Sequence, residues 1–288
     1  MATRNWSGTT SGDWSVSTNW VEGVVPASTD TVFFKNNAVS VSAGLAQSAV
    51  TLASLTIDST YTGLIGSATA YLAIGATTIA IGGASGSSTS GNGSGRIMLN
   101  MGSVQFTATV LSTAGTSTDT GLEPVRLIGT HASNKLYILG GRVGVATTVT
   151  TEVATLSEWD VSGSSSVLNL GVGCTLTSGN QTGSSFITLN TAMTTVTQSP
   201  GGTIINNGTA AITTANIGGT ITSNSTGTIT TLNLYNGATG DFSGNPAART
   251  VTTINQYPNA KLIRFAANPA HLTVTTHNLV QGGTLTLS

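Results

Sequence analysis

The sequence predicts an all-β protein, a right-handed parallel β-solenoid, in which short strands stack as successive coils. Thr, Ser, Asn and Gly make up half of the 288 residues, and only 7% of the residues are charged. β-Branched residues favour strands, and runs of strong helix formers are nearly absent. Apolar and polar residues alternate in short runs that recur about every 20 residues, a spacing that fits one coil stacked on the next.

The charge balance and the hydropathy exclude several classes of protein. Nine Lys and Arg against ten Asp and Glu give a formal net charge of −1, which lacks the basic footprint of a nucleic-acid-binding protein. No apolar run approaches the ~20 residues of a membrane-spanning helix, and the first residues lack the apolar core of a secretory signal, so we expect neither. The single cysteine, Cys174, excludes an internal disulfide and is expected to be a small buried side chain.

The N-terminal segment, residues 1–45, is expected to cap the solenoid. Three of the four tryptophans lie close together at the start of the chain, and an open solenoid end exposes apolar side chains and unpaired strand edges. Bulky aromatic residues and the turn formers Gly23 and Pro26 suit a cap. The same segment could also dock a partner protein, because tryptophan is enriched at interfaces, and both roles can hold together. The candidate anchor residues are Trp6, Trp14, Trp20, Pro26 and Phe34.

Residues 46–288 are expected to form the body of the solenoid. The alternating triplet Leu55–Ile57 returns as Leu72–Ile74, and a further alternating run begins at Ile97, which extends the period toward the N-terminus. At ~4.8 Å per stacked strand, about eleven coils would form a rod of roughly 50 Å. Residues 82–95, rich in Gly and Ser, are expected to form a flexible loop outside the coil, because the spacing resumes beyond them.

The clearest repeats lie in residues 194–288. A motif Thr-Thr-x-Asn, degenerate in its first copy, returns at nearly regular steps, with copies that begin at Thr194, Thr213, Thr230, Thr252 and Thr275. Each copy is followed by Gly-Gly, Asn-Gly or Pro-Asn at a nearly fixed offset. Glycine and asparagine tolerate the backbone conformations of tight turns, so each copy predicts a short strand, a turn and a second short strand.

An aliphatic residue precedes the first Thr in four copies: Ile212, Ile229, Val251 and Val274. So regular a series is expected to point into the solenoid. Because side chains alternate along a strand, the second Thr is expected to share the inner face, and the first Thr and the variable residue are expected to share the outer face. Stacked Asn and Thr side chains suit this geometry, since they hydrogen-bond along the axis.

One string of the N-terminal segment carries a resemblance. It reads Asn19-Trp20-x-x-Gly23-x-x-Pro26-x-x-x-Asp30-x-Val32-x-Phe34. Together with Leu52-Ala53-Ser54-Leu55-Thr56-Ile57 and Tyr61-Thr62-Gly63-Leu64-Ile65-Gly66, it resembles β-helical proteins of tailed-phage virions and adhesin-like bacterial surface proteins. Such adhesins normally carry an export signal and a membrane-anchoring barrel, and we expect neither here. The resemblance therefore implies a phage structural protein that decorates the capsid or forms a head or tail fibre.

Chemical groups for catalysis are sparse, and the sequence predicts no enzyme, no cofactor and no metal site. β-Solenoids also carry polysaccharide hydrolases, which need two carboxylates about 5–9.5 Å apart. Among the ten acids only Glu158 and Asp160 form a close pair, on one face of a strand with Trp159 on the other. A solvated strand edge or a trimer contact is the plainer interpretation of that pair. No His, Cys and Asp spacing indicates a metal ligand set.

These observations favour a non-enzymatic structural protein of a phage virion, a capsid decoration or head-fibre subunit assembled in the host cytoplasm. The expected partners are two further copies in a homotrimer, because exposed rows of Thr, Ser and Val are usually covered by symmetry mates, and the major capsid protein or another virion protein. Two alternatives stay open: a receptor-binding tail fibre or spike that binds host glycan, and a fragment of a bacterial surface adhesin. No nucleic-acid or membrane partner is expected.

Overall fold

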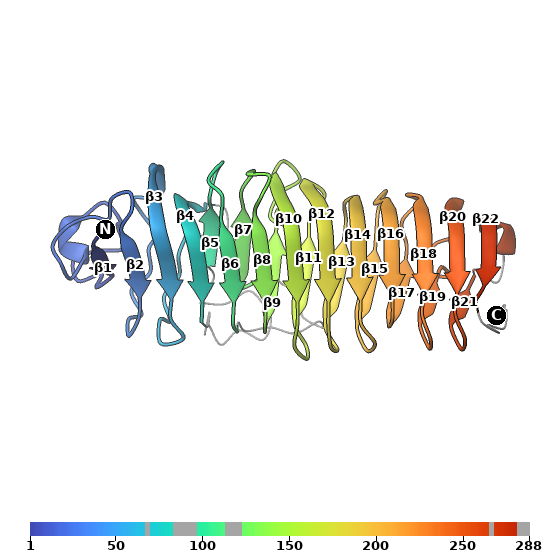
Figure 1. Cartoon of the computed structure of the whole chain (residues 1–288). Coiled ribbons are helices and arrows are strands. Elements are labelled where there is room, and N and C mark those ends of the chain that lie inside the picture. Colours follow the sequence, from blue (N-terminus) through green and yellow to red (C-terminus); the bar gives the residue numbers. More distant parts are fainter. Residues whose placement is uncertain (67–69, 83–96, 113–122, 265–267, 281–288) are drawn as a thin grey trace.

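The computed structural model describes residues 1–66, 70–82, 97–112, 123–264 and 268–280. They form one elongated rod with β1 near one end and β22 near the other (Figure 1). Within these residues the only helical segments are two 3-10 turns, η1 (Ser17–Asn19) and η2 (Pro269–His271). No helix in this part of the chain is long and apolar enough to cross a membrane. The prediction of an all-β solenoid is confirmed.

Thirteen strands stack in parallel, each beside the next, as one row that we call the long row. At ~4.8 Å per step, the row is about 58 Å long. Its strands lie side by side along the rod (Figure 1) and are β1 (Thr3–Asn5), β2 (Thr31–Phe34), β3 (Ala46–Ile57), β4 (Leu72–Ile81), β6 (Thr107–Val110), β8 (Lys135–Ile138), β10 (Ala154–Val161), β12 (Cys174–Gln181), β14 (Met193–Gln198), β16 (Ile212–Ile217), β18 (Ile229–Leu234), β20 (Arg249–Gln256) and β22 (Leu272–Leu279).

Nine shorter strands form a second parallel row, the short row. From β8 to β21, each coil is a long-row strand, a turn, a short-row strand and a loop that leads to the next long-row strand. The strands of the short row are β5 (Ile97–Asn100), β7 (Val125–Ile128), β9 (Arg142–Val145), β11 (Val167–Leu170), β13 (Phe186–Leu189), β15 (Thr203–Asn206), β17 (Thr220–Ser223), β19 (Thr239–Asp241) and β21 (Lys261–Ile263).

The interior of the rod is one apolar core that runs from Trp6 to Leu272. At one point in this core a large side chain on one coil packs against a glycine on the next. Trp159 is fully buried, and the next coil places Gly179 beside it, where a Cβ would lie 1.9 Å from the indole ring. Because a packed interior has no spare volume, glycine at position 179 makes the room that Trp159 fills.

The C-terminal repeats stack at the predicted steps. Thr195 pairs with Thr214, Thr214 with Thr231, Thr231 with Thr253 and Thr253 with Thr276, so the copies lie directly beside one another. The aliphatic residues that precede the first Thr point inward, as expected: Ile212, Ile229 and Val251 are buried, and Val274 in the last strand is half-buried.

The predicted outward position of the first Thr is confirmed, since Thr213 and Thr230 are exposed, but the faces predicted for the second Thr and for the variable residue are wrong. The variable residues Ala215, Leu232 and Ile254 are fully buried, whereas the second Thr, such as Thr231, is half-buried and faces outward. The pairing of β16 with β18 skips the first Thr of each motif, so the regular alternation is interrupted there. Two consecutive Thr side chains therefore face outward, and every later residue is shifted to the face opposite to the predicted one.

The period proposed near the N-terminus is also wrong. Leu55 pairs with Ile79 rather than with Leu72, and Leu72 pairs with Leu99. The prediction treated two apolar triplets as neighbours in the stack, but they do not pair. The coils in this region are longer than the spacing between those triplets. The loop predicted for residues 82–95 lies, apart from Gly82, outside the described residues.

Candidate functional site

Residues 1–45, which include the Asn19–Phe34 motif, form one end of the rod, which we call the cap. Asn19 is fully buried at its centre. Its Oδ1 accepts hydrogen bonds from the backbone amides of Thr10 and Ser11, both at 2.9 Å, and its Nδ2 donates to Ser11 Oγ and to the Asp13 carbonyl. An amide side chain offers two N–H donors and two acceptor lone pairs. All four of these on Asn19 form hydrogen bonds inside the cap.

An aromatic cluster fills the cap beside Asn19. Trp20 packs edge-on against Trp6 and Trp14, with ring centroids 5.1 and 4.7 Å apart, and its Nε1 donates to the Trp14 carbonyl at 2.9 Å. Phe34 of β2 contacts all three tryptophans and also Tyr61, whose ring centroid lies 5.0 Å away. Such aromatic pairs contribute about 0.5–1.5 kcal/mol each beyond the area they bury. The cluster therefore ties the cap to the residues that follow β3.

The buried carboxylate of Asp30 holds the first residues of the chain in the cap. Asp30 accepts hydrogen bonds from the backbone amides of Ala2 and Ala27 at 2.8 and 3.2 Å and from Arg4 Nε at 3.0 Å. Burial by itself would raise the pKa of Asp30, but the amide hydrogen bonds and the Arg4 charge outweigh it and hold the pKa below its usual range. Asp30 is therefore an ionised clamp that holds the start of the chain against β2.

The five candidate anchor residues, Trp6, Trp14, Trp20, Pro26 and Phe34, are all buried. The core of the cap therefore covers these side chains in the chain itself, and their role as an anchor for a partner stays a prediction. The boundary at residue 45 also does not separate two cores, since β2 pairs with β3 in register. Docking through the outside of the cap, where Val21 and Val24 are 68% and 47% exposed, stays a prediction.

The Glu158–Asp160 pair lies on the outer face of β10, as alternation predicted. Glu158 accepts hydrogen bonds from Lys135 Nζ at 2.7 Å and Tyr137 Oη at 2.9 Å, and Asp160 accepts one from Asn180 Nδ2 at 2.9 Å. The hydrogen bond from Lys135, followed by the one from Tyr137, holds the pKa of Glu158 below its usual range. Glu158 is thus a paired carboxylate at neutral pH, which does not suit the general acid of a glycosidase.

A buried ionic cluster lies on the outer side of the short row. Glu123 and Arg126 are 6% and 1% exposed. Arg126 Nε and Nη2 both lie 3.1 Å from Glu123 Oε2, and the same carboxylate accepts hydrogen bonds from Thr147 Oγ1 at 2.9 Å and Asn169 Nδ2 at 2.8 Å. These hydrogen bonds join β7, β11 and the loop after β9 through one buried carboxylate.

The cluster continues through the loop that follows β9. Arg126 Nη1 donates to Thr148 Oγ1 at 2.8 Å, Tyr71 Oη lies 2.8 Å from the same oxygen, and the Thr148 amide donates to Glu152 Oε2 at 2.9 Å. Burial raises the pKa of Tyr71, so this phenol stays neutral. At Gly144 a Cβ would lie 2.7 Å from Glu123 Oε2, and glycine therefore admits the carboxylate.

Sequence reasoning missed this cluster. Its one local signal is the (i, i+3) spacing of Glu123 and Arg126, which is common among surface residues. Asn169, a partner of Glu123, lies far along the chain, and only the stacking of coils brings the two together.

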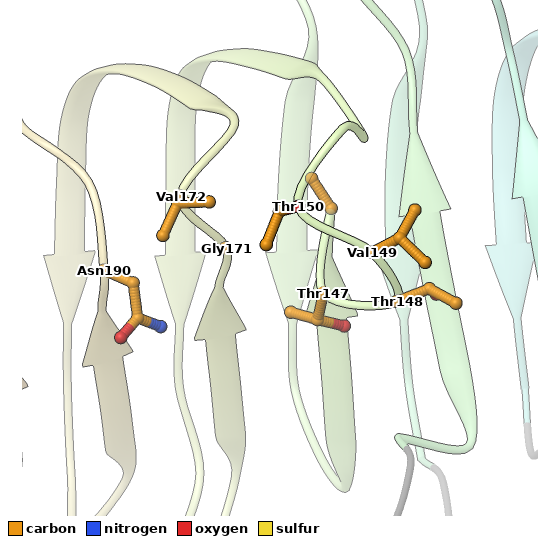
Figure 2. A pocket seen from close by; sticks show the side chains of 8 residues that line it. Thr147, Thr148, Val149, Thr150, Gly171, Val172 and Asn190 are labelled. Atoms are coloured by element: carbon orange, nitrogen blue, oxygen red, sulfur yellow. The ribbon is translucent and has the colours of Figure 1, made fainter.

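Beside the ionic cluster lies a shallow hollow of about 260 Å³ (Figure 2). Its described lining contains no carboxylate, imidazole or thiol, and its two valines, Val149 and Val172, are 54% and 58% exposed. The hollow therefore offers hydroxyl and amide groups but no acid or base. It is lined by Ala146, Thr147, Thr148, Val149, Thr150, Gly171, Val172 and Asn190.

The outer face of the long row from β14 to β22 is a second extended surface, which we call the Thr/Asn face. The first Thr of each motif also faces outward but is left out of the pairing, and each strand contributes two further outward residues in register. They are Thr195 and Thr197, Thr214 and Asn216, Thr231 and Asn233, Thr253 and Asn255, and Thr276 and Asn278.

The isolated reactive groups are structural. Cys174 is buried, as predicted, with its Sγ 3.3 Å from the Val145 carbonyl oxygen, and burial raises the pKa of the thiol to about 12. Within the described residues no three His, Cys, Asp or Glu side chains lie close enough together to hold a metal ion.

Comparison with known proteins adds no family to this description. The chain matches no protein-family model, no curated protein and no solved structure.

Proposed function

We propose that the chain is a non-enzymatic structural protein of a tailed-phage virion, a capsid decoration or head-fibre subunit. The observation that carries the proposal is the single core that joins the aromatic cap to every coil of a rod about 58 Å long. Such a rod gives length and stiffness to an assembly. Its interior is filled by its own apolar side chains.

The carboxylates support this role. Each of the nine acids in the described residues accepts at least one hydrogen bond from the protein itself. Catalytic acids are instead exposed to a substrate in a cleft and have shifted pKa values suited to proton transfer. The acids of this rod are used to fix loops and turns.

The proposed partners are two further copies in a homotrimer and the major capsid protein or another virion protein. Sedimentation equilibrium tests the first, and we expect a trimer that persists in mild denaturant. A monodisperse monomer would overturn it.

The virion assignment is tested in the cells from which the gene comes. Particles purified on a density gradient should contain the chain by mass spectrometry, and a reconstruction should show rods of this length on the particle. Cells in which particle production is blocked are the control. If the chain fractionates with the cell surface and never with particles, the adhesin alternative replaces the proposal.

Attachment through the cap is tested by surface variants that leave its core intact. Val21→Asp with Val24→Asp should abolish binding to particles that lack the chain, because both side chains are exposed on the cap. Val172→Asp, at an equally exposed position in the middle of the rod, is the matched control and should bind normally. Equal binding by both variants would place the attachment site elsewhere.

A further inference from the structure

The Thr/Asn face carries an ordered ladder of amides along the rod. Asn233 Nδ2 donates to Asn216 Oδ1 at 2.7 Å, Asn255 Nδ2 to Asn233 Oδ1 at 2.7 Å, and Asn278 Nδ2 to Asn255 Oδ1 at 2.8 Å. Each bond joins neighbouring strands, so the amides repeat at the strand spacing of ~4.8 Å. The ladder fixes the orientation of every amide before a ligand arrives, which lowers the entropic cost of binding.

The ladder leaves hydrogen-bonding capacity free on β18 and β20. An amide has two N–H donors and two acceptor lone pairs, and Asn233 and Asn255 each spend one of each on the ladder. Beside them, the half-buried hydroxyls of Thr231 and Thr253 make no hydrogen bond to any described residue. Strands β18 and β20 thus each present a hydroxyl, an amide donor and an amide acceptor at the surface.

Two tyrosines border the ladder. Tyr235 and Tyr257 directly follow β18 and β20, just beyond Asn233 and Asn255, and their ring centroids are 5.1 Å apart. Tyr235 is 39% exposed, and its hydroxyl lies 3.5 Å from Asn216 Oδ1. An exposed ring next to oriented amides offers an apolar platform beside polar partners, the combination that a molecule with both C–H faces and hydroxyl edges requires.

The lack of charged residues on the Thr/Asn face favours a neutral ligand over an anionic one. None of the ten outward residues of the Thr/Asn face is charged, so an anionic polymer would find no cation there. Three Arg or Lys residues belong to these coils, and none is among the ten residues: Arg249 is buried, Lys261 lies in β21 of the short row, and Arg264 directly follows β21.

We propose that the Thr/Asn face binds a neutral, linear polysaccharide that lies along the rod, with a sugar ring stacked on Tyr235 and sugar hydroxyls hydrogen-bonded to the amide ladder. A polymer with hydroxyls at regular intervals matches a surface whose donors and acceptors also repeat. The proposal stands apart from the virion assignment, because a rod from any source could carry this face.

The test is titration of the full chain with neutral hexasaccharides of glucose, mannose and N-acetylglucosamine, with a hexamer of galacturonic acid as the anionic probe. We expect at least one neutral probe to bind and the anionic probe not to bind. Tyr235→Ala should weaken that binding at least tenfold, and Asn255→Ala should weaken it several-fold. Tyr137→Ala, on the same row but outside the face, is the control and should leave the affinity unchanged.

Three results would overturn the proposal. These are no binding of any neutral probe at millimolar concentration, preference for the anionic probe, or unchanged affinity in Tyr235→Ala. Circular dichroism and sedimentation of each variant complete the test. If Tyr235→Ala is folded but changes the oligomeric state, the face is an interface between copies, which also overturns the proposal. If Tyr235→Ala fails to fold, Tyr257→Ser replaces it, with the same expected loss.

Discussion

The two ends of the long row build their coils differently. From β14 to β22 the coils are short, as in the pairing of Thr214 with Thr231, and the outer face is a plain repeat of Thr and Asn. From β3 to β8 the coils are longer, as in the pairing of Ile79 with Ala108. Next to these longer coils, the loop that follows β9 is tied down by the buried ionic cluster.

The difference shows two ways of specifying one architecture. A short coil has few residues outside its strands, so the repeat alone sets which residues stack. Longer coils add segments whose backbone must be ordered against its own conformational entropy, and specific polar contacts then hold those segments in place. The C-terminal coils should therefore be sensitive to core substitutions, and the N-terminal coils to loss of single polar partners as well.

The largest effect is expected from a charge placed in the core of a regular coil. Ile229→Asp buries an unpaired carboxylate between stacked coils and should lower the free energy of unfolding by more than about 4 kcal/mol. Leu232→Asp should be equally severe, because the structure places Leu232 inside. Thr230→Asp, at an exposed position, should change stability by less than about 1 kcal/mol. Melting temperatures of the three variants test this order. A Leu232→Asp variant that melts close to the unmodified protein would refute the inward position of Leu232.

The ionic cluster should come next. Arg126→Met removes the nearer of the two guanidinium groups beside the buried Glu123 carboxylate and leaves only Arg142, whose Nη2 lies 3.9 Å from Oε1, so it should cost about 3 kcal/mol in urea unfolding. Lys135→Met breaks the half-exposed Lys135–Glu158 pair and should cost much less, because solvent screens that pair. Similar losses in the two variants would mean that burial does not set the strength of these pairs.

The cap should respond to pH through Asp30. The folded pKa of Asp30 lies below the unfolded value of about 3.9, so its contribution is complete above that value and is lost as the pH falls through the folded pKa. Asp30→Asn should cost about 1–3 kcal/mol at neutral pH, because hydrogen bonds to a charged group are lost. Unfolding curves recorded from neutral to acidic pH should be flatter for the variant, and parallel curves would exclude Asp30 as the titrating group.

The smallest effect is expected from the amide ladder. Asn233→Ala removes two ladder hydrogen bonds on a half-exposed surface and should cost about 1 kcal/mol. Thr231→Ala, on the same strand and with no hydrogen bond to a described residue, should cost less. If calorimetry found the two variants equally stable, the hydrogen bonds of the ladder would make no net contribution to the stability of the fold.

Much of the fold could be predicted from the sequence, and the reason is local. Strand formation follows from β-branched residues in alternation, and the steps of the C-terminal coils follow from direct repetition of Thr-Thr-x-Asn. The outward position of Glu158 and the inward position of Trp159 follow from alternation within one strand. The burial of Cys174 follows from its chemistry. Each of these properties depends on the residue itself or on close neighbours in the chain.

The tertiary structure alone decided the rest. Whether Thr231 or Leu232 faces the core depends on the interruption of pairing at the preceding Thr, and no repeat reveals where the alternation breaks. The contact of Glu123 with Asn169 depends on stacking across coils of unequal length. The tryptophans were visible in the sequence as a group, but their burial beside Asn19 is a property of the folded cap. The sequence by itself determined the composition of the coils and the period of the C-terminal ones, because local propensity and direct repetition act along the chain. The structure determined the longer N-terminal coils and which side chains meet, because contacts between coils act across it.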